Sequence, residues 1–443
     1  MSHCHFIPPY LLQGLADQTD DPDLAGRARS TLETDTRFRE RRLQPQAGPT
    51  DSDAERPRRR IHTAENTEDL PGTPVRAEGE PATGDEAVDE AYDGVGATWS
   101  LFNEAYSRDS YDDAGHRLDV TVHYGRDYAN AFWDGRQLVF GDGDGKVFQR
   151  FTKAPDVVAH EFTHGVTQYT AGLAYRNQPG ALNESVSDVF AALTVQRSRN
   201  ETADTASWLI GEGLFTEAVN GDALRSMKAP GTAYDDPQIG KDPQPATMDG
   251  YVETTDDNGG VHINSGIPNH AFYLAATAIG GHAWEQAGAI WYATVTDPRL
   301  GAQADFSRFA AVTVSAAERL FADDPTPAKA VRDAWTAVGV ELADVEAPSP
   351  EGPDQGHQVT VRRSGGVTGV TVEERIDTAT ATQGARVEEL LSEVQLDTLA
   401  ASDSQPDRYV FTIDVDGETV RVQEQDVPPP VAELIDLVLH QQR

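Results

Sequence analysis

The chain has almost no cysteine and no long apolar stretch. Its 443 residues contain one cysteine, Cys4, which excludes an internal disulfide. No hydrophobic run reaches the length of a transmembrane helix. The N-terminus also lacks the basic and apolar regions of a secretory signal peptide. From these absences we expect a soluble protein that starts in the cytoplasm, with export by another route left open.

Positive charge is scarce, and lysine in particular is rare. The chain has 36 Lys and Arg against 73 Asp and Glu, which gives a formal net charge of −37. Such a surface repels nucleic-acid phosphates and anionic lipids, so we expect neither nucleic acid nor membrane as a partner. Self-repulsion of this size needs screening, and molar salt shortens the Debye length to about 3 Å. The charge therefore predicts a halophilic protein.

Changes in composition predict several units along the chain. Residues 10–42 have a helical pattern, and the Pro-, Asp- and Arg-rich residues 43–60 are typical of an exposed, cleavable linker. Turns and β-like runs fill 61–153, apart from a helical pattern around 98–107, and helical patterns dominate 154–342. A second Pro-rich linker is expected at 346–357.

The last 86 residues predict a separate small α+β unit. The pattern favours a hairpin that turns on Asp416-Gly417. The expected elements are strands at 358–366 and 367–377, a helix at 386–396, the hairpin at 409–426 and a helix at 428–442.

The strongest chemical signal is HEFTH, residues 160–164. On a helix, His160 and His164 share one face, so both imidazoles can bind one Zn²⁺. Glu161 between them can act as the general base toward a zinc-bound water. The alternative is a solvated helix that carries two unrelated histidines.

A second acidic motif completes the predicted metal site. Glu184, in GALNESVSD, follows His164 by twenty positions. A turn between two helices would bring it back as the third protein ligand and leave the fourth position for water. Asp188, one helical turn further, can accept the second N–H of a ligand imidazole. Asn183 is a candidate for the same supporting role.

HEFTH followed by GALNESVSD resembles the thermolysin family of zinc metallopeptidases, and further motifs follow in family order over about residues 61–342. The resemblance implies an α+β fold with a two-lobed core. The β-rich N-lobe would span 51–170, the helical C-lobe 171–345, and the zinc helix would lie between them. The implied activity is that of a neutral endopeptidase made as a zymogen. The rival hypothesis is a catalytically silent, regulated peptide-binding protein; the presence of Glu161 and His262 argues against it.

The resemblance also implies catalytic roles outside the zinc motif. His262, in DNGGVHINSG, matches the catalytic histidine and would be oriented by Asp257. Tyr175, in TAGLAY, matches the tyrosine that steadies the oxyanion. Both side chains would donate hydrogen bonds where negative charge develops.

Substrate contacts are implied in the same way. In YANAFWDG, Asn130 and Ala131 match the edge-strand residues that bind the substrate backbone, and Arg225, in LRSM, matches the arginine that binds a substrate carbonyl. A hydrophobic pocket would select bulky apolar residues just after the cleaved bond. By the same match this pocket would be lined by Phe148, Phe151, Val157, Ile210 and Leu224.

The family's double-calcium site is incomplete in this sequence. Asp156 and Glu212 match two of its acids, but Val195 and Leu209 stand where two others are expected. A double site is therefore not expected, and a single weak calcium site stays open.

The N-terminal segment MSHCHFIPPYLL resembles the short propeptides of the protealysin subgroup. Residues 1–50 would then be an inhibitory pro-domain, with Pro8, Pro9 and Tyr10 in or near the active-site cleft. Because a thiolate is a good zinc ligand, Cys4 could occupy the open fourth position on the metal; His3 or His5 could serve similarly. The alternative is an amphipathic N-terminal helix with a disordered leader.

Residues 357–443 resemble emfourin, a small proteinaceous inhibitor of protealysin-like peptidases. The resemblance implies an inhibitor-like module fused to its own target, so that both the propeptide and this domain would be intramolecular inhibitors. A substrate-binding or secretion-related β-domain is the competing interpretation.

Overall fold

A computed structural model describes most of the chain, in two compact units that are described separately, Met1–Val345 and Glu346–Arg443. The described residues are 4–40, 56–344, 358–365, 372–378, 387, 390–391, 409–415, 418–423, 425 and 427–439. Among them, no helix has both the length and the apolar character needed to cross a lipid bilayer.

The N-terminal segment forms a short strand and two helices, where the sequence predicted one helical region. Strand β1 is Cys4–His5, α1 is Pro9–Gln18 and α2 is Pro22–Glu40. Proline suits the start of α1, because the first N–H groups of a helix have no intrahelical partner. The Asp21 carboxylate accepts hydrogen bonds from the backbone N–H groups of Asp23 and Leu24, so it caps α2 and separates the two helices.

Strand β1 forms the edge of the main sheet, whose order is β1-β5-β6-β4-β2-β3. It pairs antiparallel with β5, with Cys4 opposite Trp133 and His5 opposite Phe132. The N-terminal segment therefore completes a sheet that belongs otherwise to the core. The other strands are β2 (Arg59–Thr63), β3 (Thr73–Ala77), β4 (Leu118–Val122), β5 (Ala131–Trp133) and β6 (Leu138–Phe140).

Helix α3 (Glu86–Tyr106) is twice as long as the helix expected around 98–107. Its first half contains Gly94 and Gly96, which weaken the helical signal. Close packing explains both glycines: a Cβ atom at Gly94 would lie 3.2 Å from Val158 side-chain carbons, and one at Gly96 would lie 2.3 Å from the Arg59 guanidinium. Asp85 caps the helix by accepting hydrogen bonds from the backbone N–H groups of Ala87 and Val88.

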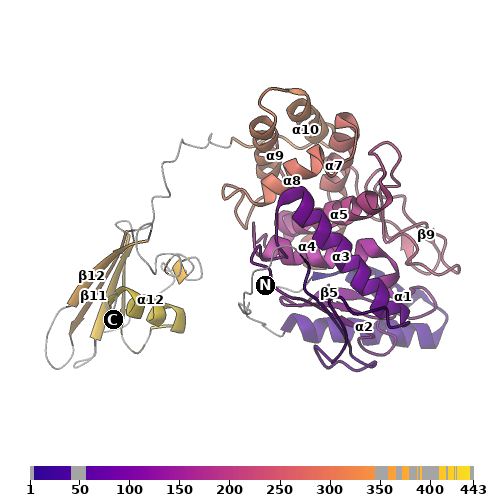
Figure 1. Ribbon diagram of the computed structural model, residues 1–443, viewed down its shortest axis with the longest axis horizontal. Helices are drawn as coiled ribbons and strands as arrows, with labels where there is room; N and C mark the ends of the chain where they lie inside the picture. Colours follow the sequence, from indigo (N-terminus) through magenta and orange to yellow (C-terminus); the bar gives the residue numbers. More distant parts are fainter. Residues whose placement is uncertain are drawn as a thin grey trace. The chain divides into compact units, whose positions relative to one another are not determined.

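Two central helices, α4 (Pro155–Gln168) and α5 (Asn177–Arg199), separate the sheet from a group of C-terminal helices (Figure 1). This arrangement confirms the predicted α+β class, with one β-rich and one helical region. The remaining helices of this unit are α6 (Asp257–Asn264), α7 (Gly266–Ile279), α8 (Gln286–Val295), α9 (Phe306–Leu320) and α10 (Thr326–Ala337). Short strand pairs join β7 (Leu209–Ile210) with β8 (Arg225–Ser226), and β9 (Asp235–Asp236) with β10 (Gly240–Lys241).

The described part of the second unit has an antiparallel sheet of order β12-β11-β13-β14 and a C-terminal helix. Its elements are β11 (Gln358–Gly365), β12 (Val372–Asp377), β13 (Tyr409–Val415), β14 (Glu418–Gln423) and α12 (Pro429–Leu439). Val359, Ile413 and Leu434 are among the side chains of its own apolar core. The expected hairpin is present as β13 and β14, while its turn and most of the helix predicted at 386–396 lie outside the described residues.

Candidate functional site

Helices α4 and α5 bring His160, His164 and Glu184 together. One ligand atom from each residue lies within 4.8 Å of the others, and all three side chains are buried. The two Nε2 atoms are 3.0 Å apart, and the Glu184 carboxylate oxygens lie 3.4 Å from His160 Nε2 and 3.5 Å from His164 Nε2. Two imidazoles and one carboxylate at this spacing are a donor set that Zn²⁺ prefers.

The carboxylate of Glu161 supports the same interpretation. It is completely buried, and neither of its oxygens has a hydrogen-bond partner. Burial raises the pKa of Glu161 to about 8. A buried carboxyl group without partners is costly to maintain, so its place beside the His–His–Glu cluster fits a cation and its water.

The ring nitrogens that face away from the cluster are held by other side chains. His160 Nδ1 is 2.9 Å from Asp188 Oδ1, and His164 Nδ1 is 2.9 Å from Asn183 Oδ1. Ser187 Oγ lies 3.1 Å from His164 Nδ1, a contact that the sequence did not indicate. Hydrogen bonds at Nδ1 leave Nε2 of each ring for a metal.

Asp188 also accepts hydrogen bonds from two residues far away in sequence. Arg225 donates from Nε and Nη2, both at 2.8 Å, and Asn269 donates from Nδ2 at 2.8 Å. Burial alone would raise the pKa of the Asp188 carboxyl, but Arg225 and His160 lower it to about 2. Arg225, assigned by resemblance to a substrate carbonyl, therefore makes its strongest contacts with Asp188. Nothing in the local sequence marked Asn269.

His262 and Tyr175 lie next to Glu184 of the cluster. His262 Nδ1 is 2.6 Å from Asp257 Oδ1, and the His262 backbone N–H donates to Asp257 Oδ2 at 2.9 Å. Tyr175 Oη is 3.2 Å from His262 Nε2 and donates a short hydrogen bond to Glu184 Oε1. Two donors thus converge beside the zinc ligands.

The N-terminal segment occupies this site, but residues 5–7 make the main contacts. The backbone N–H of Phe6 donates to Ala131 O at 3.0 Å, and that of Ile7 donates to Asn130 Oδ1 at 2.8 Å. His5 O lies 2.8 Å from Nε2 of His262.

The residues expected in the cleft, Pro8, Pro9 and Tyr10, follow the contacting residues and begin α1. Burial raises the pKa of Tyr10 well above its usual range, and Tyr234 and Asp257 raise it further. Tyr10 therefore lies near the site. The side chain of Cys4 is outside the described residues, so its contact with zinc stays a prediction.

The residues expected to form the hydrophobic pocket are all buried in the same apolar core as Phe6. The Phe6 ring itself is fully buried and meets the Phe151 ring edge to face, with 6.5 Å between centroids. The other residues of this expected pocket are Phe148, Val157, Ile210 and Leu224, each at most 2% exposed.

The two candidate calcium ligands have other partners. Asp156 accepts hydrogen bonds from the backbone N–H groups of Gly211 at 2.6 Å and Val157 at 3.0 Å, and burial raises its pKa to about 6. Glu212 is exposed and pairs with Arg199 at 3.3 Å. Within the described part of the chain, His160, His164 and Glu184 form the only group of three or more such residues that could hold a metal ion.

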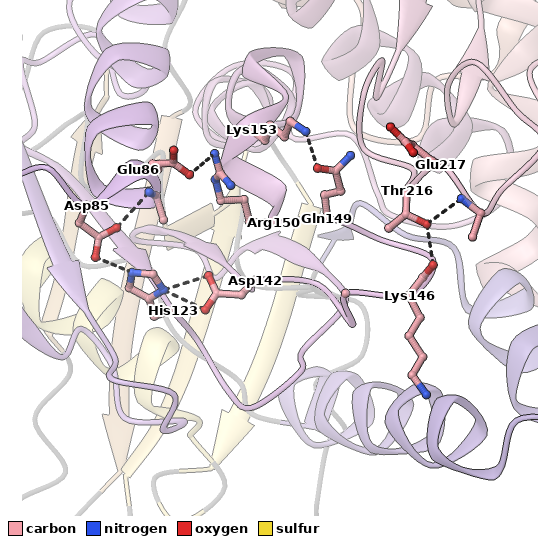
Figure 2. A pocket seen from close by; sticks show the side chains of 13 residues that line it. Asp85, Glu86, His123, Asp142, Lys146, Gln149, Arg150, Lys153, Thr216 and Glu217 are labelled. Atoms are coloured by element: carbon pink, nitrogen blue, oxygen red, sulfur yellow. Dashed lines mark hydrogen bonds and ion pairs between the residues drawn. The ribbon is translucent and has the colours of Figure 1, made fainter.

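A surface pocket of about 1150 Å³ lies at the start of α3, and none of the predicted site residues lines it (Figure 2). Its charges are largely paired with each other: His123 bridges Asp85 and Asp142, and Arg150 pairs with Glu86. This pairing is typical of a structural ion network, so the buried group of His160, His164 and Glu184 remains the candidate active site.

Comparisons with known proteins agree with this geometry. The chain matches the family description "Thermolysin metallopeptidase, catalytic domain" over residues 50–168 and "Thermolysin metallopeptidase, alpha-helical domain" over 171–340. Residues 361–439 match "Emfourin".

Similar proteins match about three quarters of the chain. An "Extracellular metalloprotease" of Pectobacterium carotovorum subsp. carotovorum is 49% identical over 340 residues, which cover 76% of this chain and 97% of that protein. "Protease PrtS" of Photorhabdus sp. is 45% identical over 344 residues, 76% of this chain and 92% of that protein. The solved precursor of protealysin from Serratia proteamaculans has a TM-score of 0.70 and 51% identity, and the match covers 76% of this chain and 99% of that one.

These relatives correct the expected location. The expectation of a cytoplasmic protein is wrong, because similar proteins, among them the one from Pectobacterium carotovorum, are described as extracellular. The expectation used the absence of a standard signal peptide, which carries no information about other export routes.

Proposed function

This chain belongs to the thermolysin family of zinc metallopeptidases, and from that premise we propose how its own residues bind and cut a protein substrate. The chain is a zinc-dependent peptidase with a precursor form. The observation that carries the proposal is the buried cluster of His160, His164 and Glu184 beside a Glu161 carboxylate without hydrogen-bond partners. A silent binding protein would have no need to maintain such a costly group.

Each catalytic side chain has a distinct proposed task. Zinc held by the cluster would polarise the scissile carbonyl and lower the pKa of its bound water. Glu161 accepts a proton from the attacking water and delivers it to the leaving amine. His262, oriented by Asp257, and Tyr175 donate hydrogen bonds to the carbonyl oxygen as negative charge develops on it.

We further propose that the enzyme prefers a bulky apolar residue immediately after the cleaved bond. Asn130 and Ala131 would hold the substrate backbone. The Phe6 ring meets the Phe151 ring edge to face, and Cζ of the Arg225 guanidinium lies over it, 4.7 Å from the ring centroid; both contacts support this preference.

The pro-segment and the C-terminal unit are proposed as two inhibitors within one chain. Residues 1–50 would block the cleft until the linker is cut, and 357–443 would act as an emfourin-like regulator. The helix α12 and the Emfourin match favour this over a pure β-domain for substrate binding or secretion. Titrating separately expressed 357–443 against the mature core tests the idea, and unchanged peptidase activity would reject it.

Location, salt and calcium complete the proposal. We propose that the enzyme is secreted and works in salt-rich surroundings, where its net charge of −37 is screened. Calcium would occupy at most one weak site.

Casein hydrolysis tests the activity directly. The mature enzyme should degrade casein, and both a zinc chelator and Glu161→Gln should abolish the degradation. Activity that survives both changes would sink the proposal.

A further inference from the structure

We propose that the His5–Phe6 peptide bond is itself a substrate of the active site. The precursor would then cut itself within its N-terminal leader, the residues that precede α1. This inference rests on the proposed function. It makes the leader a peptide held for hydrolysis and not only an obstruction.

The first support is the seating of the backbone on the C-terminal side of this bond. Phe6 N–H donates to Ala131 O at 3.0 Å, and Ile7 N–H donates to Asn130 Oδ1 at 2.8 Å. Asn130 Nδ2 donates back to Ile7 O at 3.3 Å. These are the two core residues proposed to hold a substrate backbone, and the leader uses both.

The second support is the carbonyl group of the bond. His5 O lies 2.8 Å from His262 Nε2, the group proposed to stabilise the scissile carbonyl. Tyr175 Oη is 3.2 Å from the same nitrogen, and Glu184 Oε2 is 3.5 Å from it. The His5 carbonyl is therefore the leader group presented to the oxyanion donors beside the zinc ligands.

The third support is the residue that follows the bond. The Phe6 side chain is fully buried, its ring meets the His160 ring edge to face with 5.1 Å between centroids, and Arg225 covers it at 4.7 Å. Arg225 Nη1 also lies 3.5 Å from Phe6 O. A bulky apolar residue directly after the cleaved bond is what the proposed specificity requires.

The sequence of the leader favours this register over its neighbours. Sliding the leader by two or three residues would place a proline nitrogen, of Pro8 or Pro9, where Phe6 N–H now donates to Ala131. Proline has no N–H to donate. The helix that begins at Pro9 and buries Leu11, Leu12 and Leu15 further fixes the register.

The reaction is a simple hydrolysis that needs only water. The water oxygen bonds to the His5 carbonyl carbon, the bond from that carbon to the Phe6 nitrogen breaks, and Glu161 carries a proton from the water to that nitrogen. The products are a five-residue peptide that ends in a His5 carboxylate and a precursor that begins at Phe6.

The cut would remove strand β1 from the edge of β5 while Phe6 and Ile7 stay anchored by α1. It would open one half of the cleft and leave the other half filled. Maturation would then have two steps, removal of residues 1–5 followed by cleavage in the linker.

Intact-mass analysis and N-terminal sequencing of the full chain test the proposal. Precursor purified in chelator and then given zinc should lose Met1–His5 and show a pro-segment that begins at Phe6, at a first-order rate independent of protein concentration. Phe6→Leu should keep this cut, and Phe6→Asp and Glu161→Gln should each slow it at least tenfold.

Hydrogen exchange gives a readout that does not depend on activity. In the full-length Glu161→Gln chain, the amides of Phe6 and Ile7 should exchange at least tenfold more slowly than in the same chain with Phe6→Asp. Equal rates would overturn the proposed seating. A pro-segment released with Met1–His5 still attached, from enzyme that hydrolyses casein, would overturn the cut while leaving the proposed function intact. Failure to hydrolyse casein after the linker is cut by trypsin would reject the proposed function.

Discussion

Asp35, on helix α2 of the proposed pro-segment, accepts a hydrogen bond from Nδ2 of Asn130 in the core, with 2.9 Å between the atoms. Both side chains are fully buried. Tyr128 Oη donates to the other Asp35 oxygen at 2.6 Å, and His5 Nε2 lies 3.3 Å from it. Asn130, which we propose binds the substrate backbone, is thus held by α2 on one side and by Ile7 on the other.

Replacing Asp35 with alanine should weaken the docking of the pro-segment. The substitution leaves the Tyr128 hydroxyl and the Asn130 amide buried without their acceptor, which costs about 2 kcal/mol, or roughly a thirtyfold faster release of the pro-segment. The rate at which the precursor gains peptidase activity measures this effect. Glu33→Ala, an exposed change on the same helix, is the control; equal rates for the two variants would contradict the prediction.

Lys146 links the core to the pro-segment through surface ion pairs. Its ammonium group lies 2.6 Å from Asp21 and 2.8 Å from Asp23. Exposed pairs contribute about 1 kcal/mol or less and are screened by salt. Lys146→Gln should therefore speed pro-segment release less than tenfold in low salt, with no difference in molar NaCl. A large effect that persists in molar salt would show that the contribution of these pairs is not mainly electrostatic.

His123 predicts a pH dependence of stability outside the active site. Its hydrogen bonds to Asp142 and, to a smaller extent, to Asp85 raise the pKa of His123 to about 9, against a reference value of about 6.5 (Figure 2). Because the folded pKa is the higher one, the stabilisation is complete below about pH 6.5 and is lost as the pH rises through about 9. The site is partly open to solvent, so we expect about 1 kcal/mol from the network.

Thermal unfolding of His123→Gln measures this contribution. The variant should melt below the wild type at pH 6 and at the same temperature at pH 10. In a background that carries Asp85→Asn and Asp142→Asn, the difference at pH 6 should disappear. A melting difference that is unchanged between pH 6 and pH 10 would rule out the charged histidine as its cause.

The zinc ligands were predictable because helical spacing alone places His160 and His164 on one face. The partners that join distant segments were not. Asn269 reaches Asp188 from another helix, and Asp35 reaches Asn130 across 95 positions. No local pattern encodes such contacts, which depend on how whole helices pack.

The placement of Pro8, Pro9 and Tyr10 in or near the cleft stays a prediction, and the hydrogen bonds to Asn130, Ala131 and His262 are made by residues 5–7. The sequence pattern favoured Pro8 and Pro9 as the residues in the cleft, whereas the Phe6 side chain fills the apolar site. The register depends on backbone pairing with β5, and residues 131–133 carry no sign of where an added strand will begin. Likewise the first half of α3 was not predicted as helix, because it contains glycines. Those glycines are required by close packing against Val158 and Arg59.

Asp188 should control zinc affinity without touching the metal. Its carboxylate holds His160 Nδ1 at 2.9 Å and pairs with Arg225 at 2.8 Å. The negative charge of Asp188 orients the imidazole and makes it a better ligand for zinc. Asp188→Asn removes this charge, and such changes weaken metal binding about 10–100-fold. It also leaves Arg225 buried without its counter-ion, which should lower the melting temperature of the zinc-free protein. Competition with a chromophoric chelator measures the affinity, and Asp204→Asn, on an exposed turn of the same unit, is the control. If both variants bind zinc as tightly as the wild type, the hydrogen bond to His160 has no part in holding the metal.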